Sequence, residues 1–442
     1  MNSIAVQQKR FIQLAPSNNS SAGYGPKGSQ PIIRFSVADT QALALLKDAR
    51  LNATINVFKA TTADKVALGD DINVDPVLGM CSVMDQVIVS SRRFGTQIEQ
   101  VVNLGRLESS YYRSRYSPKM MASHAYHESK AVGLGRYNKW AGSTITSSQT
   151  DDIRAKASRK SLIGPQSVSL PFHIGVFLTD QPVDLSAVGG LEIAVYLQKA
   201  DALFFGSDAD IGNMNYTLSD VSLTVPLLYK SADMIAQTPP ESVVEFLNWT
   251  SLYSVLDSEV SSIAQRLYLS GLVAGIHNAL PTAQINNTGY NQFALKQVGV
   301  ERLTFLKDGQ RSPLEKTTIV QEDRLPPGQA RSIENESTTY PEVLREYLSA
   351  WGPAKDNKHS QVIPQNVKGI TNRCGVVGMG CNYSPDSSGI NVSGVLSLDV
   401  QSKRQQDTAV NPDPNVDEPY ALFSFYLSRQ GFLASPAGLK SI

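Results

Sequence analysis

Cysteine and histidine are both scarce in this sequence: its 442 residues include 3 cysteines and 5 histidines. An odd and small number of cysteines excludes a disulfide framework and favours reduced thiols in a cytosolic or nuclear compartment. Cys374 and Cys381 are separated by six residues, a wider spacing than is common in zinc sites. The sequence therefore predicts no structural zinc and no other cofactor.

Long apolar runs and net charge are also lacking. No run reaches the roughly 18 to 20 apolar residues that a membrane span needs, and residues 1–16 have no continuous apolar stretch like that of a signal peptide. Basic and acidic residues are equal in number, 40 of each, so no net field attracts nucleic acid or anionic lipid. We expect a soluble protein without a membrane span whose copies repel one another little, which favours self-association.

Three patterns that imitate functional motifs fail the tests of their classes. Residues 23–28 have dinucleotide-binding glycine spacing, but no predicted strand precedes them and no helix follows. The HAYHE segment at 124–128 is not a zinc-protease motif. Segments 71–82 and 413–424 begin like calcium loops but lack the required central glycine and final glutamate. We therefore predict no catalytic or metal-binding residue, and a protein that is not an enzyme.

Short runs of β-forming residues, bounded by turn residues, recur along the chain from residue 31 onward. The runs are 32–37, 53–59, 86–90, 97–103, 167–178, 191–198 and 215–228, and then 261–269, 299–305, 317–321, 374–383, 394–401 and 421–427. No regular strand and helix alternation is present, so an all-β sandwich in two halves is predicted. Segments 240–257 and 341–351 begin with prolines suited to a first helical turn, and each is predicted to be a helix.

The N-terminal segment differs from the rest in composition. Residues 15–31 are almost entirely Ser, Asn, Gly and Pro, which bury too little apolar area to offset chain entropy. We therefore expect residues 1–31 to form a flexible arm that docks on another surface. Its contact residues would be Lys9, Arg10 and Phe11.

Residues 104–160 form a long basic and aromatic insertion, which is expected to be partly helical. They include 11 basic and 4 acidic residues, with tyrosines and a tryptophan between them. Tyr, Trp and Arg are enriched in protein interfaces, so subunit contact is the preferred interpretation. Nucleic acid is the alternative partner, because basic residues contact phosphates and aromatic rings stack on bases. The candidate contact residues are Arg113, Arg115, Tyr116, Tyr126, Arg136, Tyr137 and Trp140.

Several stretches have strand and turn sequences like those of one known family. They are VMDQVIV at 83–89 followed by GTQIE at 95–99, SLPFHIGVF at 169–177, GGLEIAV at 189–195, YTLSDVSL at 216–223, VERLTF at 300–305 with the later Asp308, Gly309 and Pro313, YALFSFYLSRQ at 420–430 and SPAG at 435–438. In this order, they resemble the double jelly-roll major capsid proteins of double-stranded DNA viruses, in particular the virophage and polinton-like group.

The resemblance implies a fold of two consecutive eight-stranded antiparallel jelly rolls with small helical insertions, at 32–235 and 236–442. It also implies a major capsid protein whose homotrimers form pseudo-hexagonal capsomers of an icosahedral shell, in a virion assembled in the host cytoplasm or nucleus. The expected partners are neighbouring capsomers and penton and minor capsid proteins. A penton or spike protein is one alternative, and a cupin-like two-domain β-sandwich enzyme, which would need clustered metal ligands, is the other.

Overall fold

The computed structural model describes most of the first half of the chain and the principal strands of the second half. The described residues are 6–26, 30–66, 70, 72–75, 78–115, 164–179, 181–206, 208–236, 241–257, 262–285, 287–289, 291–293, 300–307, 310–311, 317–318, 350, 379–382, 389–402 and 419–442. Within them, no helix is both long enough and apolar enough to cross a membrane.

The first half of the chain contributes eight successive strands, two of which are interrupted. They are β1 (Val6–Leu14), β2 (Ile32–Val37), β3 (Ala42–Ala44) with β4 (Arg50–Lys59), β6 (Met84–Ser91), β7 (Gln97–Val102), β8 (Gln166–Pro171) with β9 (Val183–Asp184), β10 (Leu191–Leu197) and β12 (Met214–Lys230). The third strand is interrupted by η1 (Leu46–Asp48), and the sixth by α4 (Gly175–Leu178).

These strands pair as a long hairpin that has been wrapped into a sandwich. The first strand pairs with the eighth, the second with the seventh, the third with the sixth and the fourth with the fifth, all antiparallel. Two further pairs, β12 with β4 and β10 with β6, complete the sheets β1-β12-β4-β8 and β2-β10-β6-β7. This connectivity is that of an eight-stranded jelly roll, and we call it roll 1.

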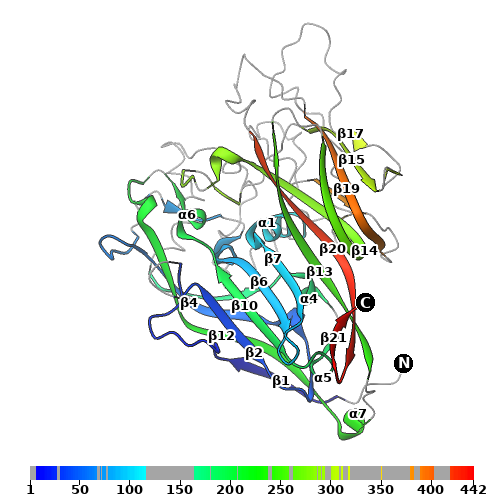
Figure 1. The fold of residues 1–442 in the computed structure, drawn as a ribbon. Helices are drawn as coiled ribbons and strands as arrows, with labels where there is room; N and C mark the ends of the chain where they lie inside the picture. Colours follow the sequence, from blue (N-terminus) through cyan, green and yellow to red (C-terminus); the bar gives the residue numbers. More distant parts are fainter. Residues whose placement is uncertain are drawn as a thin grey trace.

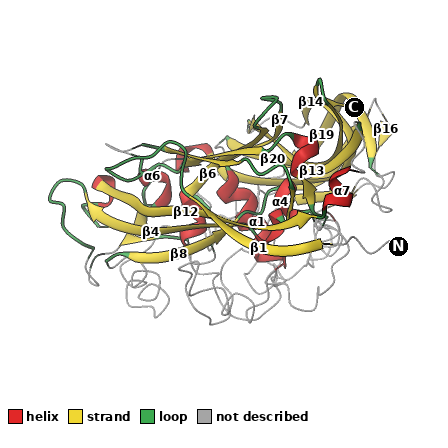
Figure 2. Ribbon diagram, turned by 90° about the horizontal axis from the view of Figure 1, so that it is seen from below, coloured by secondary structure: helices red, strands yellow, loops and turns green. Residues whose placement is uncertain are grey.

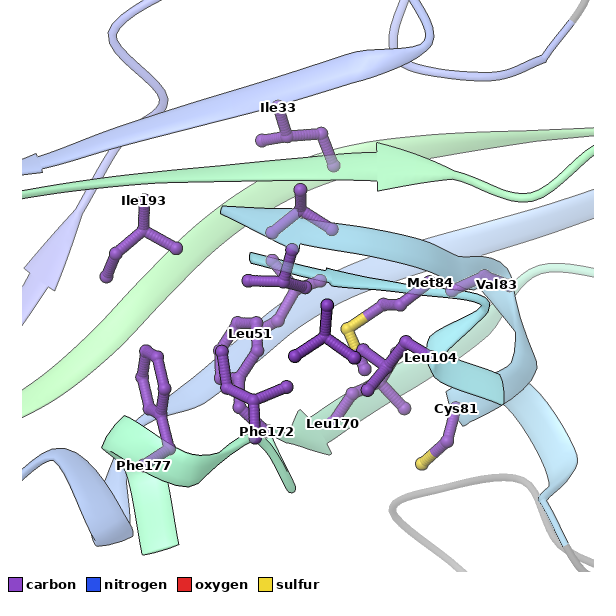
Figure 3. Packing of buried hydrophobic residues seen from close by; sticks show 14 of the residues in the cluster. Ile33, Leu51, Cys81, Val83, Met84, Leu104, Leu170, Phe172, Phe177 and Ile193 are labelled. Atoms are coloured by element: carbon purple, nitrogen blue, oxygen red, sulfur yellow. The ribbon is translucent and has the colours of Figure 1, made fainter. Parts of the chain in front are cut away.

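Alternating apolar residues fill the space between the two sheets of roll 1. On β4, Leu51 and Ile55 are buried, as are Leu191 and Ile193 on β10, since a strand turns alternate side chains to the same face. Figure 3 shows side chains of both sheets, Leu51 and Ile193 among them, in this core. Burying each such side chain fully contributes about 1.5–3 kcal/mol, so the alternation decides which face of each strand points inward.

The second half repeats the same order of strands. They are β13 (Ser242–Leu256), β14 (Ser262–Pro281), β15 (Val300–Lys307), β16 (Gln310–Arg311) with β17 (Thr317–Thr318), β18 (Met379–Asn382), β19 (Ile390–Ser402) and β20 (Tyr420–Ser435), and β21 (Gly438–Ser441) extends the edge of β20. The long strand β14 serves as both second and third strand. Its first part pairs with β19, and its last part pairs with β18 and β20.

The remaining pairs of the second half follow from this assignment. β13 pairs with β20 as first with eighth, β15 pairs with β16 and β17 as fourth with fifth, and β19 joins β15. The second half is therefore also a jelly roll, which we call roll 2. The expectation of two consecutive jelly rolls is confirmed.

The remaining elements are short and lie between the strands. They are β5 (Ile72–Asn73), η2 (Gly79–Val83), α1 (Leu104–Arg115), α5 (Leu185–Val188), α6 (Ala200–Leu203), β11 (Phe205–Gly206), η5 (Ile211–Asn213), α7 (Ala232–Ala236) and η6 (Thr282–Gln284). Figure 2 shows α1 and α4 between layers of strands. These two helices therefore lie within the sandwich of strands.

The two rolls stand side by side and share one continuous sheet. Strand β7 of roll 1 lies parallel to β13 of roll 2, with Gln100 opposite Thr250. The sheet therefore runs from β2 through β10, β6, β7, β13 and β20 to β14. Figure 1 shows the blue to green strands of roll 1 beside the long β13, β20 and β14 of roll 2.

The N-terminal segment differs from the expected flexible arm. Residues Val6 to Leu14 are the first strand of roll 1, paired along their length with β12. The following connection is also fastened to its own chain: Tyr24 is 3% exposed and exchanges two backbone hydrogen bonds of 2.9 and 2.7 Å with Leu218. Asn18 bonds the backbone of Ile32 and Arg34. Polar residues that predicted flexibility here satisfy backbone groups instead.

The helix expected at 240–257 is wrong, because this segment forms β13. It pairs with β20 from Ser242 to Leu256, and its β-branched and aromatic residues suit a pleated, half-buried surface. The proline signal is thus overridden by tertiary pairing. The strand expected at 167–178 ends at Pro171 and continues to helix α4. The helix expected at 341–351 lies outside the described residues except for residue 350.

The bend of β14 depends on two glycines in close contact. Gly271 has a φ of +61°, a backbone conformation that costs other residues about 1–2 kcal/mol. A Cβ on Gly271 would lie 2.9 Å from the carbonyl oxygen of Arg429, and one on Gly389 would lie 2.5 Å from the Cα of Gly271. The strand therefore turns from one sheet of roll 2 to the other only where no side chain intervenes.

We predict that Gly271→Ala destabilises the fold by about 1–2 kcal/mol or more, from strain and the contact with Arg429. Gly212→Ala is the matched control, because nothing lies within 4 Å of its Cβ position and its φ is not positive. The measurement is the thermal unfolding midpoint of each variant. Equal midpoints for both variants would contradict this role of Gly271.

Candidate functional site: the seam and the free edge of roll 1

At the seam between the rolls, side chains of β13 take the place of the backbone hydrogen bonds that usually join neighbouring strands. The Asn248 Nδ2 donates to the carbonyl oxygen of Ile98 at 2.8 Å, and the Val102 N–H donates to the Ser251 Oγ at 3.0 Å. Both bonds satisfy backbone groups on the edge of β7 with side chains from β13. An edge strand left open would offer these groups to other chains, so the seam closes it.

The carboxylate of Glu99 is the central group of this seam. Its Oε1 accepts backbone N–H bonds from Gly175 at 2.8 Å and from Trp249 at 2.7 Å, and its Oε2 accepts one from Val176 at 2.8 Å. Glu99 is only 2% exposed. One side chain on β7 therefore binds α4 of its own roll and β13 of the other roll.

Burial and hydrogen bonding act on the pKa of Glu99 in opposite directions. Burial favours the neutral acid and raises the pKa to about 7, while the three N–H donors favour the carboxylate and oppose that rise. The desolvation effect is the larger of the two. The charge of the seam therefore changes close to neutral pH.

Helix α4 approaches β13 so closely that only glycine fits at its first position. A Cβ on Gly175 would overlap the backbone of Leu247 and Asn248, so a larger residue would push the rolls apart. Glu99 and Gly175 both lie in stretches that carry the resemblance, 95–99 and 169–177. Their contacts at the seam give a physical reason for a glutamate and a glycine at these two positions.

Helix α1 is a second connection between the rolls. Leu104 and Leu107 are buried in the core of roll 1, and Figure 3 shows Leu104 beside Met84 and Leu170. The insertion expected to begin as a contact surface at residue 104 therefore begins as an interior helix. The leucines of α1 were the sequence signal for burial, and the basic residues around them obscured that signal.

The opposite side of α1 contacts roll 2. The Asn278 Nδ2, on β14, donates to the Arg106 carbonyl oxygen at 3.4 Å and the Ser110 Oγ at 3.2 Å. The Arg106 guanidinium lies 4.2 Å from the ring centre of Phe423 on β20, a cation–π contact. Roll 1, α1 and roll 2 therefore pack as one unit.

A buried histidine and glutamate lie at the base of α1. The His173 Nδ1 is 3.3 Å from the Glu108 Oε1, and the rings of Tyr111 and Tyr112 lie 4.6 and 4.8 Å from the imidazole centre. Such a pair can transfer protons only when a substrate reaches it. Here the side chains are 7% and 0% exposed, so the pair joins α1 to the segment before α4.

The first of the two segments that imitate calcium loops, 71–82, is a structural brace, and residues 413–418 of the second lie outside the described residues. The Asp75 Oδ1 accepts the Leu78 N–H, and its Oδ2 accepts the Asn291 Nδ2, both at 2.8 Å. Both carboxylate oxygens therefore already bind groups of the protein. Across the described part of the chain, no group of three or more His, Cys, Asp or Glu residues could hold a metal ion.

The structure places three of the predicted contact residues together on β1. The Lys9 ammonium lies 5.2 Å from the ring centre of Phe11, and the Arg10 guanidinium lies 5.4 Å from that of Tyr229. Phe11 is 66% exposed. Arg113 and Arg115 belong to α1, but their side chains are not described, and Tyr116, Tyr126, Arg136, Tyr137 and Trp140 lie outside the described residues.

Phe11 belongs to an apolar stripe on the outer face of its sheet. In register, Phe11 lies opposite Pro226, and Leu228 lies opposite Leu43. The neighbours Ala42, Ala44 and Leu227 are fully buried, so alternation turns Leu43 and Leu228 outward. We call Phe11, Leu43 and Leu228 the outer stripe of roll 1. It crosses β1, β12 and β3.

Comparison with known proteins identifies the fold but no close relative. No protein-family model and no curated protein matches the chain. Among solved structures, the faustovirus major capsid protein has a TM-score of 0.59 at 9% identity, covering 97% of this chain and 90% of its own. The PBCV-1 virus capsid has a TM-score of 0.54 at 10% identity, covering 98% and 96%. The Sputnik virophage structure has a TM-score of 0.51 at 11% identity, covering 99% and 88%.

The chain has the double jelly-roll fold. The comparisons span both rolls, in agreement with the strand order that the pairing shows twice.

Within the double jelly roll, we predict that Glu99 makes the fold less stable as pH rises. The ordinary pKa of 4.5 applies to the unfolded chain, whereas burial raises the folded value to about 7. The folded state therefore binds the proton more tightly, and the contribution of Glu99 is greatest below pH 4.5. About 3 kcal/mol is lost as pH rises from 4.5 to 7.

The test compares urea unfolding midpoints of the protein and of Glu99→Gln at pH 5 and pH 8. The glutamine cannot ionise and loses one acceptor at every pH, so its deficit relative to the parent should shrink at pH 8. Glu245→Gln, at an exposed position on β13, should follow the parent at both values. A constant Glu99→Gln deficit would contradict the raised pKa of Glu99.

Proposed function

We propose that this protein is a major capsid protein, the subunit that tiles the shell of an icosahedral virus. The observation that carries the proposal is the repetition of one jelly-roll strand order in two rolls joined edge to edge. Solved structures that are similar over nearly the whole chain include the faustovirus major capsid protein and the PBCV-1 virus capsid. The role is structural and requires no catalytic residue.

The proposed building unit is a homotrimer. Each subunit supplies two similar rolls side by side, so three copies form a ring of six rolls that is roughly hexagonal. A hexagonal tile can cover a closed shell in which other proteins fill the fivefold positions. The proposed partners are therefore neighbouring capsomers together with penton and minor capsid proteins, and the proposed location is the virion.

The presence of two rolls favours a major capsid protein over the alternative of a penton protein. A penton built from one jelly roll would use one eight-stranded unit, whereas this chain holds two that are joined through Glu99 and α1. The continuous core, which includes Val101 of roll 1 and Phe425 of roll 2, favours a subunit whose two rolls act together.

We predict that the purified protein forms a compact trimer with about three times the chain mass of 48.0 kDa. A ring of similar rolls closes when each contact is head-to-tail, so projections should be hexagonal. Light scattering gives the mass, and negative-stain images of the same sample give the shape. A stable monomer that never assembles at high concentration would contradict the proposed function.

A further inference from the structure

We propose that one connection of roll 2 is a strap that locks helix α1 into roll 1, so that the position of α1 depends on roll 2. The strap consists of residues 287–289 and 291–293, which lie between η6 and β15. The inference concerns how the two rolls are coupled within one chain. It therefore goes beyond the proposed capsid function and does not depend on it.

The strap enters the interior of roll 1 through a phenylalanine. Phe293 is 3% exposed and belongs to the same apolar core as Leu104 and Leu107 of α1. Its ring occupies the space that a side chain at Gly105 would need, because a Cβ on Gly105 would overlap the ring. The core around α1 is therefore completed by a residue that belongs to the other roll.

The backbone of the strap is also bonded to α1. The Ser109 Oγ donates to the Phe293 carbonyl oxygen at 2.8 Å. Ser109 follows Gly105 by four residues, and residues four apart are neighbours on one face of a helix. Gly105 and Ser109 therefore form a single contact surface for Phe293. The ring and the carbonyl group of Phe293 together fix the rotation of α1 about its own axis.

Two further residues connect the strap to other parts of roll 1. The Asn291 Nδ2 donates to the Asp75 Oδ2 at 2.8 Å, and the Asn291 Oδ1 accepts the Phe293 N–H at 3.1 Å. The Thr288 carbonyl oxygen accepts the Gly206 N–H, on β11, at 2.9 Å. Asn291 is 2% and Asp75 is 0% exposed. The bond between them is therefore costly to break, because it would leave a buried donor without its acceptor.

Asp75 extends the effect of the strap to η2, which contacts the other side of α1. The Asp75 Oδ1 accepts the Leu78 N–H, and the Asp75 carbonyl oxygen accepts the Gly79 N–H, both at 2.8 Å. These bonds position the start of η2. The Cys81 Sγ of η2 then lies 3.4 Å from the Tyr112 hydroxyl oxygen of α1. Helix α1 is therefore held by the strap directly and by η2, which the strap holds through Asp75.

This arrangement makes the packing of α1 conditional on roll 2. The strands β8 to β14 separate α1 from the strap along the chain, so nothing near α1 in the sequence can replace Phe293. Without the ring of Phe293, a void would remain beside Gly105, and voids in a packed core are destabilising. We therefore expect α1 and η2 to open together as one local unit when the strap is weakened, while the sheets of roll 1 stay closed.

Hydrogen–deuterium exchange of the full chain, read by peptide mass spectrometry, tests the strap. Phe293→Ala should speed exchange of the α1 amides at least 10-fold relative to those of β4, because it empties the space beside Gly105. Phe432→Ala is the matched control, since Phe432 is 1% exposed and contacts Phe246 inside roll 2, away from the strap. It should speed exchange in β13 and β20 and leave the ratio of α1 to β4 unchanged.

An exchange of residues between positions 75 and 291 gives the second measurement. Asn291→Asp alone should loosen α1 and η2, because it places a second carboxylate against that of Asp75 in a buried site. Adding Asp75→Asn should restore slow exchange. The amide at position 75 can still accept the Leu78 N–H and can donate to the carboxylate at position 291. This pair of variants decides the question if Phe293→Ala does not fold.

The outcomes are separate from those that test the capsid role. Exchange of α1 that rises no more in Phe293→Ala than in Phe432→Ala would overturn the strap. So would a double variant whose α1 exchanges as fast as that of Asn291→Asp alone. Either result would leave the proposed capsid function standing. Selective loosening of α1, together with its rescue in the double variant, would support the strap.

Discussion

The buried carboxylate of Glu99 determines how the two halves of this protein meet. It accepts N–H bonds from α4 of roll 1 and from β13 of roll 2, so it fixes three elements relative to one another. An isolated buried carboxylate is costly, and these three donors offset part of that cost. The close approach at Gly175 and the bonds of Asn248 and Ser251 depend on the same arrangement. Together with the contacts of α1 on roll 2, it sets the relative orientation of the two rolls.

The repeated strand order explains why the seam joins unlike edges. Each roll ends on one side with its first strand and on the other with its fifth, so the fifth strand of roll 1 meets the first strand of roll 2. The N-terminal strand β1 is part of this logic and not an appendage, because it completes the first sheet of roll 1. Deleting residues 2–28 would therefore remove a strand of the fold together with the buried Tyr24, and its effect would not be limited to assembly.

The sequence predicts the strands well where one face of a sheet is buried. Period-two patterns located β2 and β10 within one residue of their ends, since burial imposes that period. The sequence-based prediction failed at β13 and β1. The prolines before β13 suggested a helix, and the polar residues after β1 suggested a flexible arm. Pairing with β20 and β12, which are distant in the sequence, makes both segments strands. Pairing partners of this kind cannot be read from local composition. Glu99 and Gly175 were found only as part of a resemblance, because nothing local marks a carboxylate whose donors lie 76 and 150 residues away.

The central claim is that Glu99 joins the two rolls into one subunit of fixed shape, three of which form the proposed capsomer. A three-dimensional reconstruction of the purified oligomer tests it most directly. The account predicts a threefold ring of six similar rolls, in which β7 lies beside β13 in the same way in every subunit. A particle without a threefold ring, or a ring whose subunits hold their two rolls at different angles, would contradict it.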